Sequence, residues 1–246
     1  MNTSVLDNER LSVVIVGNGT IAMSLARALL QRENLASLLM LSRSGTTGLT
    51  DPRVVEAAFS LDEPGSLLEA AKLVGTGPLH ILINSVGVLH GPGLQPEKRL
   101  SELTLENMQQ AFAVNAMLLP MLAQAFGPAL KHREPAMLAS LSARVGSISD
   151  NRMGGWYSYR ASKAAHNMLL TTLAREWRVS HKNVAVVALH PGTVQSRLSE
   201  PFVTSRYRNR VLSGDESAEA LLAVIASLNA KDTGAFLDWE GKAIPW

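Results

Sequence analysis

The feature that most constrains the fold is a turn of small residues directly after an apolar run near the start of the chain. The run Leu11 to Val16 is rich in β-branched residues, as expected for a strand that is covered on both faces. Gly17-Asn18-Gly19-Thr20-Ile21-Ala22 comes next, and residues 21–31 then have the apolar spacing of a helix. A strand, a G-x-G-x-x-A turn and a helix in this order are typical of a dinucleotide-binding turn, although a plain strand-to-helix turn has the same outline.

Strand-like and helix-like segments alternate along the rest of the chain. The apolar runs expected to be strands lie at residues 38–41, 79–83, 136–141 and 184–189. The segments with helical spacing lie at residues 64–74, 103–125, 159–180 and 216–229. This alternation predicts an α/β fold, a doubly wound parallel sheet of the Rossmann type with helices on both faces. Because no repeat or linker divides the chain, we expect residues 1–246 to form a single domain, with residues 1–10 as a flexible N-terminal segment.

Composition excludes several kinds of function. The chain has no cysteine, which excludes disulfides, thiolate metal sites and cysteine nucleophiles and fits a reducing cytoplasm. Its six histidines lack the spacing of metal ligands, so we expect no metal. A net charge of +2 and 5% aromatic residues do not fit a nucleic-acid partner. Without a secretory start or a run of the ~20 apolar residues that a membrane span requires, we expect a cytoplasmic protein with no membrane partner.

Each small residue of the turn has a physical role in binding a dinucleotide. Gly17 permits the tight turn, Gly19 lets the backbone approach a pyrophosphate, and Ala22 lets the helix pack closely on the strand. The start of the helix offers free N–H groups and a partial positive charge to phosphates. The residues expected to contact the phosphates are Gly17, Asn18, Gly19, Thr20 and Ile21.

The end of the second expected strand bears on the choice of cofactor. An acidic residue at that position would bind the ribose 2′-hydroxyl of NAD. The chain instead reads Leu41-Ser42-Arg43-Ser44, with no carboxylate. Arg43 is able to pair with a 2′-phosphate, which favours NADP(H) over NAD(H), while a solvated loop arginine is the alternative.

A tyrosine and a lysine are spaced for acid–base chemistry on one helix. Tyr159 and Lys163 are four residues apart and so share a helix face, whereas the residue four places after Tyr157 is Ala161. A phenol has a pKa of ~10, and an ammonium at ~4 Å would contribute roughly 4 kcal/mol, or roughly 3 pKa units. The spacing therefore predicts a tuned proton donor, although the same spacing is common by chance.

Five blocks in order give this pair its context. They are Val16-Gly17-Asn18-Gly19, Asn84-Ser85-Val86-Gly87, Val114-Asn115, Tyr159-x-x-x-Lys163 and Pro191-Gly192-Thr193-Val194-Gln195-Ser196. With them the chain resembles the short-chain dehydrogenase/reductase family over essentially its whole length. The stretches 154–163 and 241–246 resemble its C-factor-like branch. The resemblance implies an NADP(H)-dependent oxidoreductase that transfers hydride between nicotinamide and a small carbonyl or alcohol substrate, and a homodimer or homotetramer.

The resemblance also implies roles for single residues. Tyr159 would be the general acid/base, Lys163 would bind the nicotinamide ribose and lower the tyrosine pKa, and Asn115 would help hold a proton-relay water. The residues implied to bind the rest of the cofactor are Asn84 and Gly87 at the adenosine half, Asp62 near the adenine, and Pro191, Gly192, Val194 and Ser196 at the nicotinamide end. Two alternatives stay open: Asn115 as a helix asparagine bonded to backbone, and Asp62 as a plain helix N-cap.

The chain departs from the family pattern where the carbonyl-polarising serine is expected. The turn is one residue short with Ala22 at a usual glycine, and Ala143 stands in the usual place of the second serine. Ser142 would replace that serine only if the chain twisted or slipped by one residue. The departure leaves a second reading open, a cofactor-binding regulatory protein with vestigial catalysis. Residues 144–157, with Trp156, and 195–211 are expected to shape the substrate pocket, and an aromatic wall there favours an apolar or aromatic carbonyl unless Trp156 is simple packing.

Overall fold

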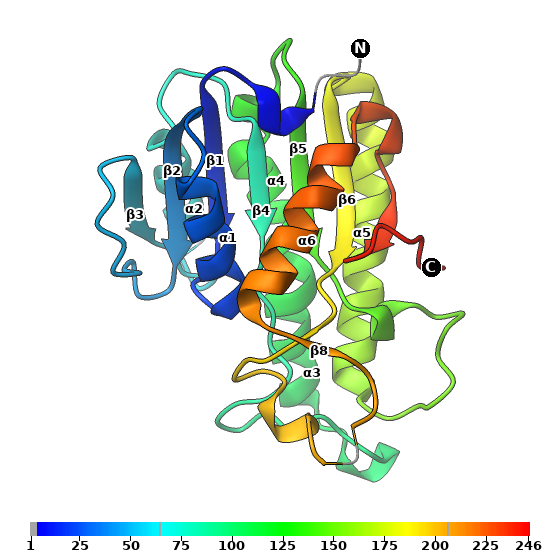
Figure 1. The fold of residues 1–246 in the computed structure, drawn as a ribbon. Coiled ribbons are helices and arrows are strands. Elements are labelled where there is room, and N and C mark those ends of the chain that lie inside the picture. The colour runs from blue at the N-terminus through cyan, green and yellow to red at the C-terminus, as the bar shows by residue number, and fades with distance from the viewer. Residues whose placement is uncertain (1–3, 64, 206) are drawn as a thin grey trace.

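The computed structural model describes residues 4–63, 65–205 and 207–246, and the core of this part is one parallel sheet (Figure 1). Its seven strands run in the order β3-β2-β1-β4-β5-β6-β9 and pair in parallel throughout. They are β1 (Leu11–Val16), β2 (Leu35–Ser42), β3 (Val54–Ala58), β4 (Ile81–Asn84), β5 (Ala136–Leu141), β6 (Val184–His190) and β9 (Phe236–Asp238). A separate short pair joins β7 (Thr193–Val194) to β8 (Val211–Leu212).

Helices cover the sheet on both faces, as Figure 1 shows. They are α1 (Thr20–Leu30), α2 (Gly65–Lys72), α3 (Leu105–Phe112), α4 (Leu118–Leu130), α5 (Tyr157–Ser180) and α6 (Gly214–Ser227). The apolar residues of β1 alternate between two buried clusters, one shared with α1 and α6 and the other with α2, α4 and α5. A strand buried on both faces reads as a continuous apolar run, which is why this segment stood out in the sequence.

The strand order reverses between β1 and β4, because the chain builds outward to β3 from one and to β9 from the other. Parallel doubly wound sheets bind ligands at the carboxyl ends of the strands beside such a reversal. The predicted fold class, a single doubly wound α/β domain, is confirmed.

The expected elements match the structure closely where the apolar runs are long. The strands β1 and β5 have the predicted bounds. The helix expected over 103–125 is α3 and α4 joined by a π-helical turn at Ala113–Met117, and it continues to Leu130. The expected helix start at Pro64 lies outside the described residues. The sequence patterns did not predict β3 or β9.

The N-terminal segment is packed from Ser4 onward, unlike the flexible segment expected for residues 1–10. Val5 and Leu6 are 2% and 3% exposed and join the cluster under α1 and α6. The Asn34 side chain donates to the carbonyl oxygens of Leu6 and Asn8, both at 2.8 Å. The buried Val5 and Leu6 and the hydrogen bonds to Asn34 therefore fix this segment. Two apolar residues among polar and charged neighbours give no clear pattern in the sequence.

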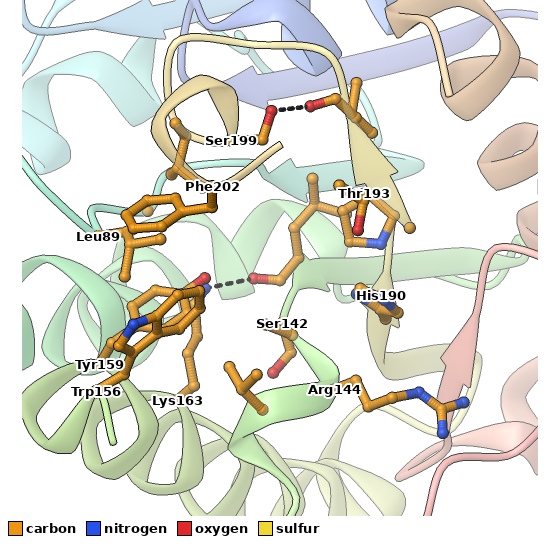
Figure 2. Close-up of a pocket in the computed structure, with 18 of the residues that line it drawn as sticks. Leu89, Ser142, Arg144, Trp156, Tyr159, Lys163, His190, Thr193, Ser199 and Phe202 are labelled. Atoms are coloured by element: carbon orange, nitrogen blue, oxygen red, sulfur yellow. Dashed lines mark hydrogen bonds between the residues drawn. The ribbon is translucent and has the colours of Figure 1, made fainter. Parts of the chain in front are cut away.

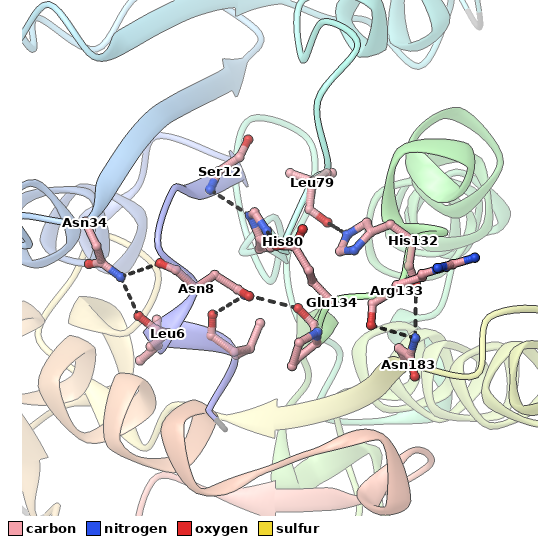
Figure 3. Close-up of polar contacts among 12 residues, drawn as sticks. Leu6, Asn8, Ser12, Asn34, Leu79, His80, His132, Arg133, Glu134 and Asn183 are labelled. Carbon is pink, nitrogen blue, oxygen red and sulfur yellow. Dashed lines mark hydrogen bonds and ion pairs between the residues drawn. The ribbon is translucent and has the colours of Figure 1, made fainter. Parts of the chain in front are cut away.

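The amino ends of the central strands are joined by polar contacts (Figure 3). His80, which is 1% exposed, accepts from the Ser12 N–H through Nδ1 at 3.0 Å and pairs through Nε2 with Glu134 at 2.8 Å. Asn8 donates to the Pro135 carbonyl at 3.2 Å. These contacts lie at the amino ends of the strands, on the side of the sheet away from the carboxyl ends.

In the part of the chain that the structure describes, one helical stretch, Leu105–Leu130, is long and apolar enough to cross a membrane by length and composition. Its most apolar stretch is 56% buried inside the fold, where α4 supplies Leu119, Leu122 and Phe126 to the core. Such burial is typical of a core helix.

Candidate active site

A cavity of about 1070 Å³ opens at the carboxyl ends of the strands (Figure 2). The predicted site residues that line it are Ile21, Gly87, Ser142, Tyr159, Lys163, Pro191, Gly192, Val194 and Ser196. The predicted site residues outside its lining are Gly17, Asn18, Gly19, Thr20, Arg43, Asp62, Asn84 and Asn115. The structure therefore brings the expected nicotinamide end and the Tyr–Lys pair into one cavity.

The turn between β1 and α1 has the geometry that phosphates require. Gly17 has φ +116°, and a Cβ there would lie 2.4 Å from the Ser85 Oγ. Gly19 is the N-cap of α1 with no side-chain cap, and a Cβ on it would meet no atom within 4 Å. No side chain caps the first N–H groups of α1 and no acidic residue stands in its first turn, so these groups are available to an anion. A pyrophosphate therefore fits this turn.

The residues expected at the adenosine half differ in what they do. Arg43 and Asp62 are both exposed, at the end of β2 and in the connection before α2. Asn84 is 2% exposed: its amide donates to the Ser140 Oγ at 3.0 Å and its Oδ1 accepts from the Val86 N–H at 3.2 Å. Asn84 thus shapes the loop after β4 from beneath.

Tyr159 and Lys163 lie on the first turns of α5 at the inner wall of the cavity (Figure 2). Burial raises the pKa of Tyr159 to about 12 and lowers the pKa of Lys163 to about 8. The Lys163 Nζ donates to the Leu141 carbonyl at 3.0 Å. The sequence predicts that the ammonium lowers the phenol pKa. In this structure the pKa of Tyr159 is raised instead, because burial disfavours the charged phenolate.

Asn115 lies in the π-helical turn between α3 and α4, a type of distortion common at functional sites. Its Oδ1 accepts from the Val88 N–H at 2.7 Å, and its Nδ2 donates to the Val88 carbonyl at 2.9 Å and to the Ser162 Oγ at 3.0 Å. Its main-chain carbonyl accepts from His166 Nδ1 at 2.9 Å. The side chain therefore joins the loop after β4 to α5, in line with the alternative of an asparagine bonded to backbone.

Ser142 and Ala143 follow β5 at the cavity wall. Ser142 is 3% exposed, and its hydroxyl donates to the Asn167 Oδ1 at 2.6 Å. Serving a substrate carbonyl would require Ser142 to give up this bond, so its contacts do not support the role expected for it. Ala143 also lines the cavity but offers no donor.

One wall of the cavity is aromatic and apolar (Figure 2). The Trp156 ring meets the Tyr159 ring edge-on at 6.1 Å between centroids and the Phe202 ring at 4.9 Å, and Leu89 lines the same side. Among the described residues, Trp156 is the non-glycine residue with positive φ, at +53°. A left-handed conformation costs about 1–2 kcal/mol, so surrounding contacts must hold it. Strain of this kind is typical of functional sites.

The opposite side of the cavity is formed by the segment after β6. Gly192 has φ +80°, and a Cβ there would lie 2.9 Å from side-chain atoms of Leu212 and of Trp239. Thr193 Oγ1 lies 2.6 Å from the hydroxyl of Tyr207, which also lines the cavity. Glycine is therefore required at 192 for conformation and for close packing.

Comparison with known proteins agrees with this geometry. The family model described as short chain dehydrogenase matches residues 13–206. The chain belongs to the short-chain dehydrogenase family. Both the Tyr–Lys pair and the phosphate turn fall inside the matched region, as does most of the lining of the cavity.

Relatives within the short-chain dehydrogenase family differ in their named roles. C-signal of Myxococcus xanthus is 34% identical over 173 residues, which cover 70% of this chain and 96% of that protein. The 1-hydroxy-2-glutathionyl-2-methyl-3-butene dehydrogenase of Rhodococcus sp. (strain AD45) is 29% identical over 65% of this chain and 67% of its own length. The structure of an NADPH-bound carbonyl reductase from chicken fatty liver superposes with a TM-score of 0.83 at 29% identity, covering 96% of this chain and all of that one.

Two buried residues near the site were missed by sequence reasoning. His166 lies one turn after Lys163, and burial lowers its pKa to about 3. Its i+3 spacing from Lys163 was a usable signal. Glu97 is 2% exposed and bonds to Ser158, which is 61 residues away in the sequence, so no local pattern could reveal it.

Proposed function

We propose that this chain is an NADP(H)-dependent oxidoreductase that transfers hydride between nicotinamide and a carbonyl or alcohol, with reduction as the favoured direction. The observation that carries the proposal is Tyr159, a buried phenol on the wall of a cavity that also contains Lys163. With its pKa raised to about 12, the phenol keeps its proton at neutral pH. To donate that proton efficiently it would need the phenolate to be stabilised in the loaded site, which is the role proposed for the Lys163 ammonium.

The residues of the chain divide the work as follows. A bound nicotinamide would supply the hydride. Tyr159 would give its phenolic proton to the oxygen of the substrate carbonyl. The charged Lys163 would hold the ribose hydroxyls of the cofactor and stabilise the phenolate that develops. Asn115 keeps the loop after β4 fixed to α5 through its amide.

Several observations support NADP(H) as the cofactor. The turn before α1 fits a pyrophosphate, and the end of β2 offers an exposed Arg43 and no carboxylate in residues 41–44. The similar carbonyl reductase from chicken is NADPH-bound. Arg43 would pair with the 2′-phosphate, and Asp62 would lie near the adenine.

The substrate that fits best is an apolar or aromatic carbonyl compound. Trp156, Phe202 and Leu89 give the cavity an apolar wall beside Tyr159. Among the described lining residues there is no Asp or Glu, so a cationic substrate would find no partner.

A second function has its own support. Ala143 leaves the cavity without the usual serine hydroxyl, and Ser142 is bonded to Asn167. C-signal, named for signalling, is similar over 96% of its length. A regulatory protein that binds the cofactor with weak catalysis is therefore the alternative.

One experiment separates the two functions. Purified protein is titrated with NADPH and NADH, then given a panel of aromatic and aliphatic ketones and aldehydes. We expect NADPH to bind more tightly and at least one aromatic carbonyl to be reduced, with Tyr159→Phe lowering kcat by roughly 10²–10⁴ while NADPH still binds. Tight binding without turnover of any carbonyl would favour the regulatory function.

The quaternary state is part of the proposal. The exposed apolar side chains Met117, Met168 and Leu169, which are 54%, 68% and 36% exposed, lie on the π-helical turn before α4 and on α5. We propose a homodimer or a homotetramer through helix faces, and light scattering of the purified protein measures its mass directly.

A further inference from the structure

The helix that carries Tyr159 begins in an unusual way. Its N-cap, Trp156, makes no side-chain cap bond, and no acidic residue stands in its first turn. The first N–H groups of a helix need partners, and an acceptor with negative charge is especially favourable there. For α5 this partner comes from a distant segment of the chain.

Glu97, in the connection between β4 and α3, supplies the missing cap. One carboxylate oxygen accepts from the Ser158 N–H at 3.1 Å, and the other accepts from the Ser158 hydroxyl. Glu97 and Ser158 are each 2% exposed, so water cannot replace these bonds. Burying a carboxylate costs free energy unless its oxygens accept hydrogen bonds. The oxygens of Glu97 accept theirs from Ser158 at the start of α5, the helix that carries Tyr159.

The backbone of Glu97 adds a contact to the preceding residue. Its carbonyl accepts from the N–H of Trp156, whose left-handed conformation needs such restraint. Arg160 restrains the same stretch from the other side, since its Nε donates to the carbonyls of Gly154 and Gly155 at 3.2 and 3.0 Å. Glu97 therefore holds the two residues on either side of the start of α5.

We propose that Glu97 is a positioning residue that sets where Trp156 and Tyr159 stand in the cavity. Tyr159 follows Ser158 directly, and the Trp156 ring contacts the rings of both Tyr159 and Phe202. A displacement near 1 Å at a reacting group costs about 100-fold in rate. Removing the carboxylate should therefore lower catalysis and move the tryptophan, while the turn between β1 and α1, whose residues 17–20 lie outside the cavity lining, is unaffected. The kinetic part rests on the proposed function.

The test compares three variants of the full chain. We expect Glu97→Ala to lower kcat at least 30-fold with the Kd for NADPH within threefold of wild type. Glu97→Gln keeps an oxygen for the N–H and an amide that donates to the hydroxyl, so its kcat should stay within threefold. The matched control is Glu102→Ala in the same connection, whose carboxylate is exposed and accepts from the Lys98 N–H at 2.8 Å; it should leave kcat unchanged.

A second readout needs neither cofactor nor substrate. Trp156 is one of four tryptophans, and its fluorine resonance in 5-fluorotryptophan protein is assigned with Trp156→Phe. We expect it to shift and broaden in Glu97→Ala while the others stay, even if wild type reduces no carbonyl. If Glu97→Ala does not fold, Ser158→Ala removes one donor and should move the same resonance.

Three results would overturn the proposal. The first is a Trp156 resonance that does not move in Glu97→Ala, or in Ser158→Ala if Glu97→Ala does not fold. The second is a loss of kcat in Glu102→Ala as large as that in Glu97→Ala, and the third is a kcat of Glu97→Gln as low as that of Glu97→Ala. The last would mean that the geometry of the two bonds is not what matters.

Discussion

At the scale of single residues, the site is shaped by desolvation. Tyr159 and Lys163 are 9% and 4% exposed. Burial raises the pKa of Tyr159 and lowers the pKa of Lys163, and both shifts favour the neutral form of the side chain. The spacing of the pair was readable from the sequence, but the partner of the ammonium was not. The Leu141 carbonyl lies 22 residues earlier and reaches Lys163 only because β5 ends beside α5.

Cofactor capture should depend on pH through Lys163. Its pKa of about 8 lies below the ordinary value of 10.5, so the ammonium is present below about pH 8 and is lost above it. We expect kcat/KM for NADPH, which reports the free protein, to fall as pH rises through about 8. Stopped-flow or steady-state rates between pH 6 and 10 measure this. Lys163→Arg keeps its charge and should be flat over the range; an equal fall in that variant would assign the step to another group.

The missing hydroxyl at residue 143 leads to a gain-of-function prediction. Ala143 lines the cavity, and one preorganised donor at a developing oxyanion is worth about 10²–10³ in rate. We expect Ala143→Ser to raise kcat at least tenfold on an aromatic ketone. Ser142→Ala, the matched control, should change kcat less than threefold because that hydroxyl is bonded to Asn167. A large loss in Ser142→Ala would return the catalytic role to Ser142.

At the scale of elements, the sequence predicted what is long and apolar and missed what depends on the assembled fold. The runs that became β1 and β5 are buried on both faces, so period and length were sufficient. The segment Val54–Ala58 is half-buried at the sheet edge and carries Glu56, and Phe236–Asp238 has only three residues in the sheet. Neither gives a clear pattern. The π-helical turn around Asn115 likewise has no local signature, since it depends on contacts with the loop after β4 and with α5.

The close approach of the segment after β5 to α5 predicts a sensitive glycine. A Cβ at Gly146 would lie 2.8–3.0 Å from the Cβ and backbone of Lys163, which cannot move aside without moving α5. We expect Gly146→Ala to lower the free energy of unfolding by about 1–3 kcal/mol and to reduce kcat. Gly65→Ala in α2, where a Cβ meets nothing within 4 Å, is the control and should be neutral or stabilising. Urea unfolding of both variants tests this prediction. If Gly146→Ala were as stable as Gly65→Ala, the segment around Gly146 and α5 would be able to move apart at little cost in free energy.

At the scale of the whole molecule, buried neutral histidines link stability to pH. Burial lowers the pKa of His166 to about 3, that of His190 to about 4, and also that of His80. Each has an unfolded pKa near 6.5, so below that pH the unfolded chain binds protons that the folded chain does not. Stability from these groups is therefore present above pH 6.5 and is lost as pH falls.

The expected loss is measurable by urea unfolding at pH 7.5 and 5. His166 alone should contribute a decrease of about 2 kcal/mol between pH 6.5 and 5. His166→Gln retains a donor for the Asn115 carbonyl and cannot be protonated, so its pH dependence should be shallower than that of wild type. Identical slopes for the two proteins would contradict a neutral buried imidazole at 166.

The polar contacts around His80 at the amino ends of the strands have a consequence for how this protein can change. They hold the N-terminal segment and the connection before β5 at the amino ends of the strands (Figure 3). The cavity opens at the carboxyl ends. Mutations that stabilise the amino ends of the strands therefore need not change the chemistry at the carboxyl ends. In laboratory evolution, a library confined to the amino edge could raise heat tolerance first, and a second library around the cavity could then explore new substrates on the sturdier scaffold.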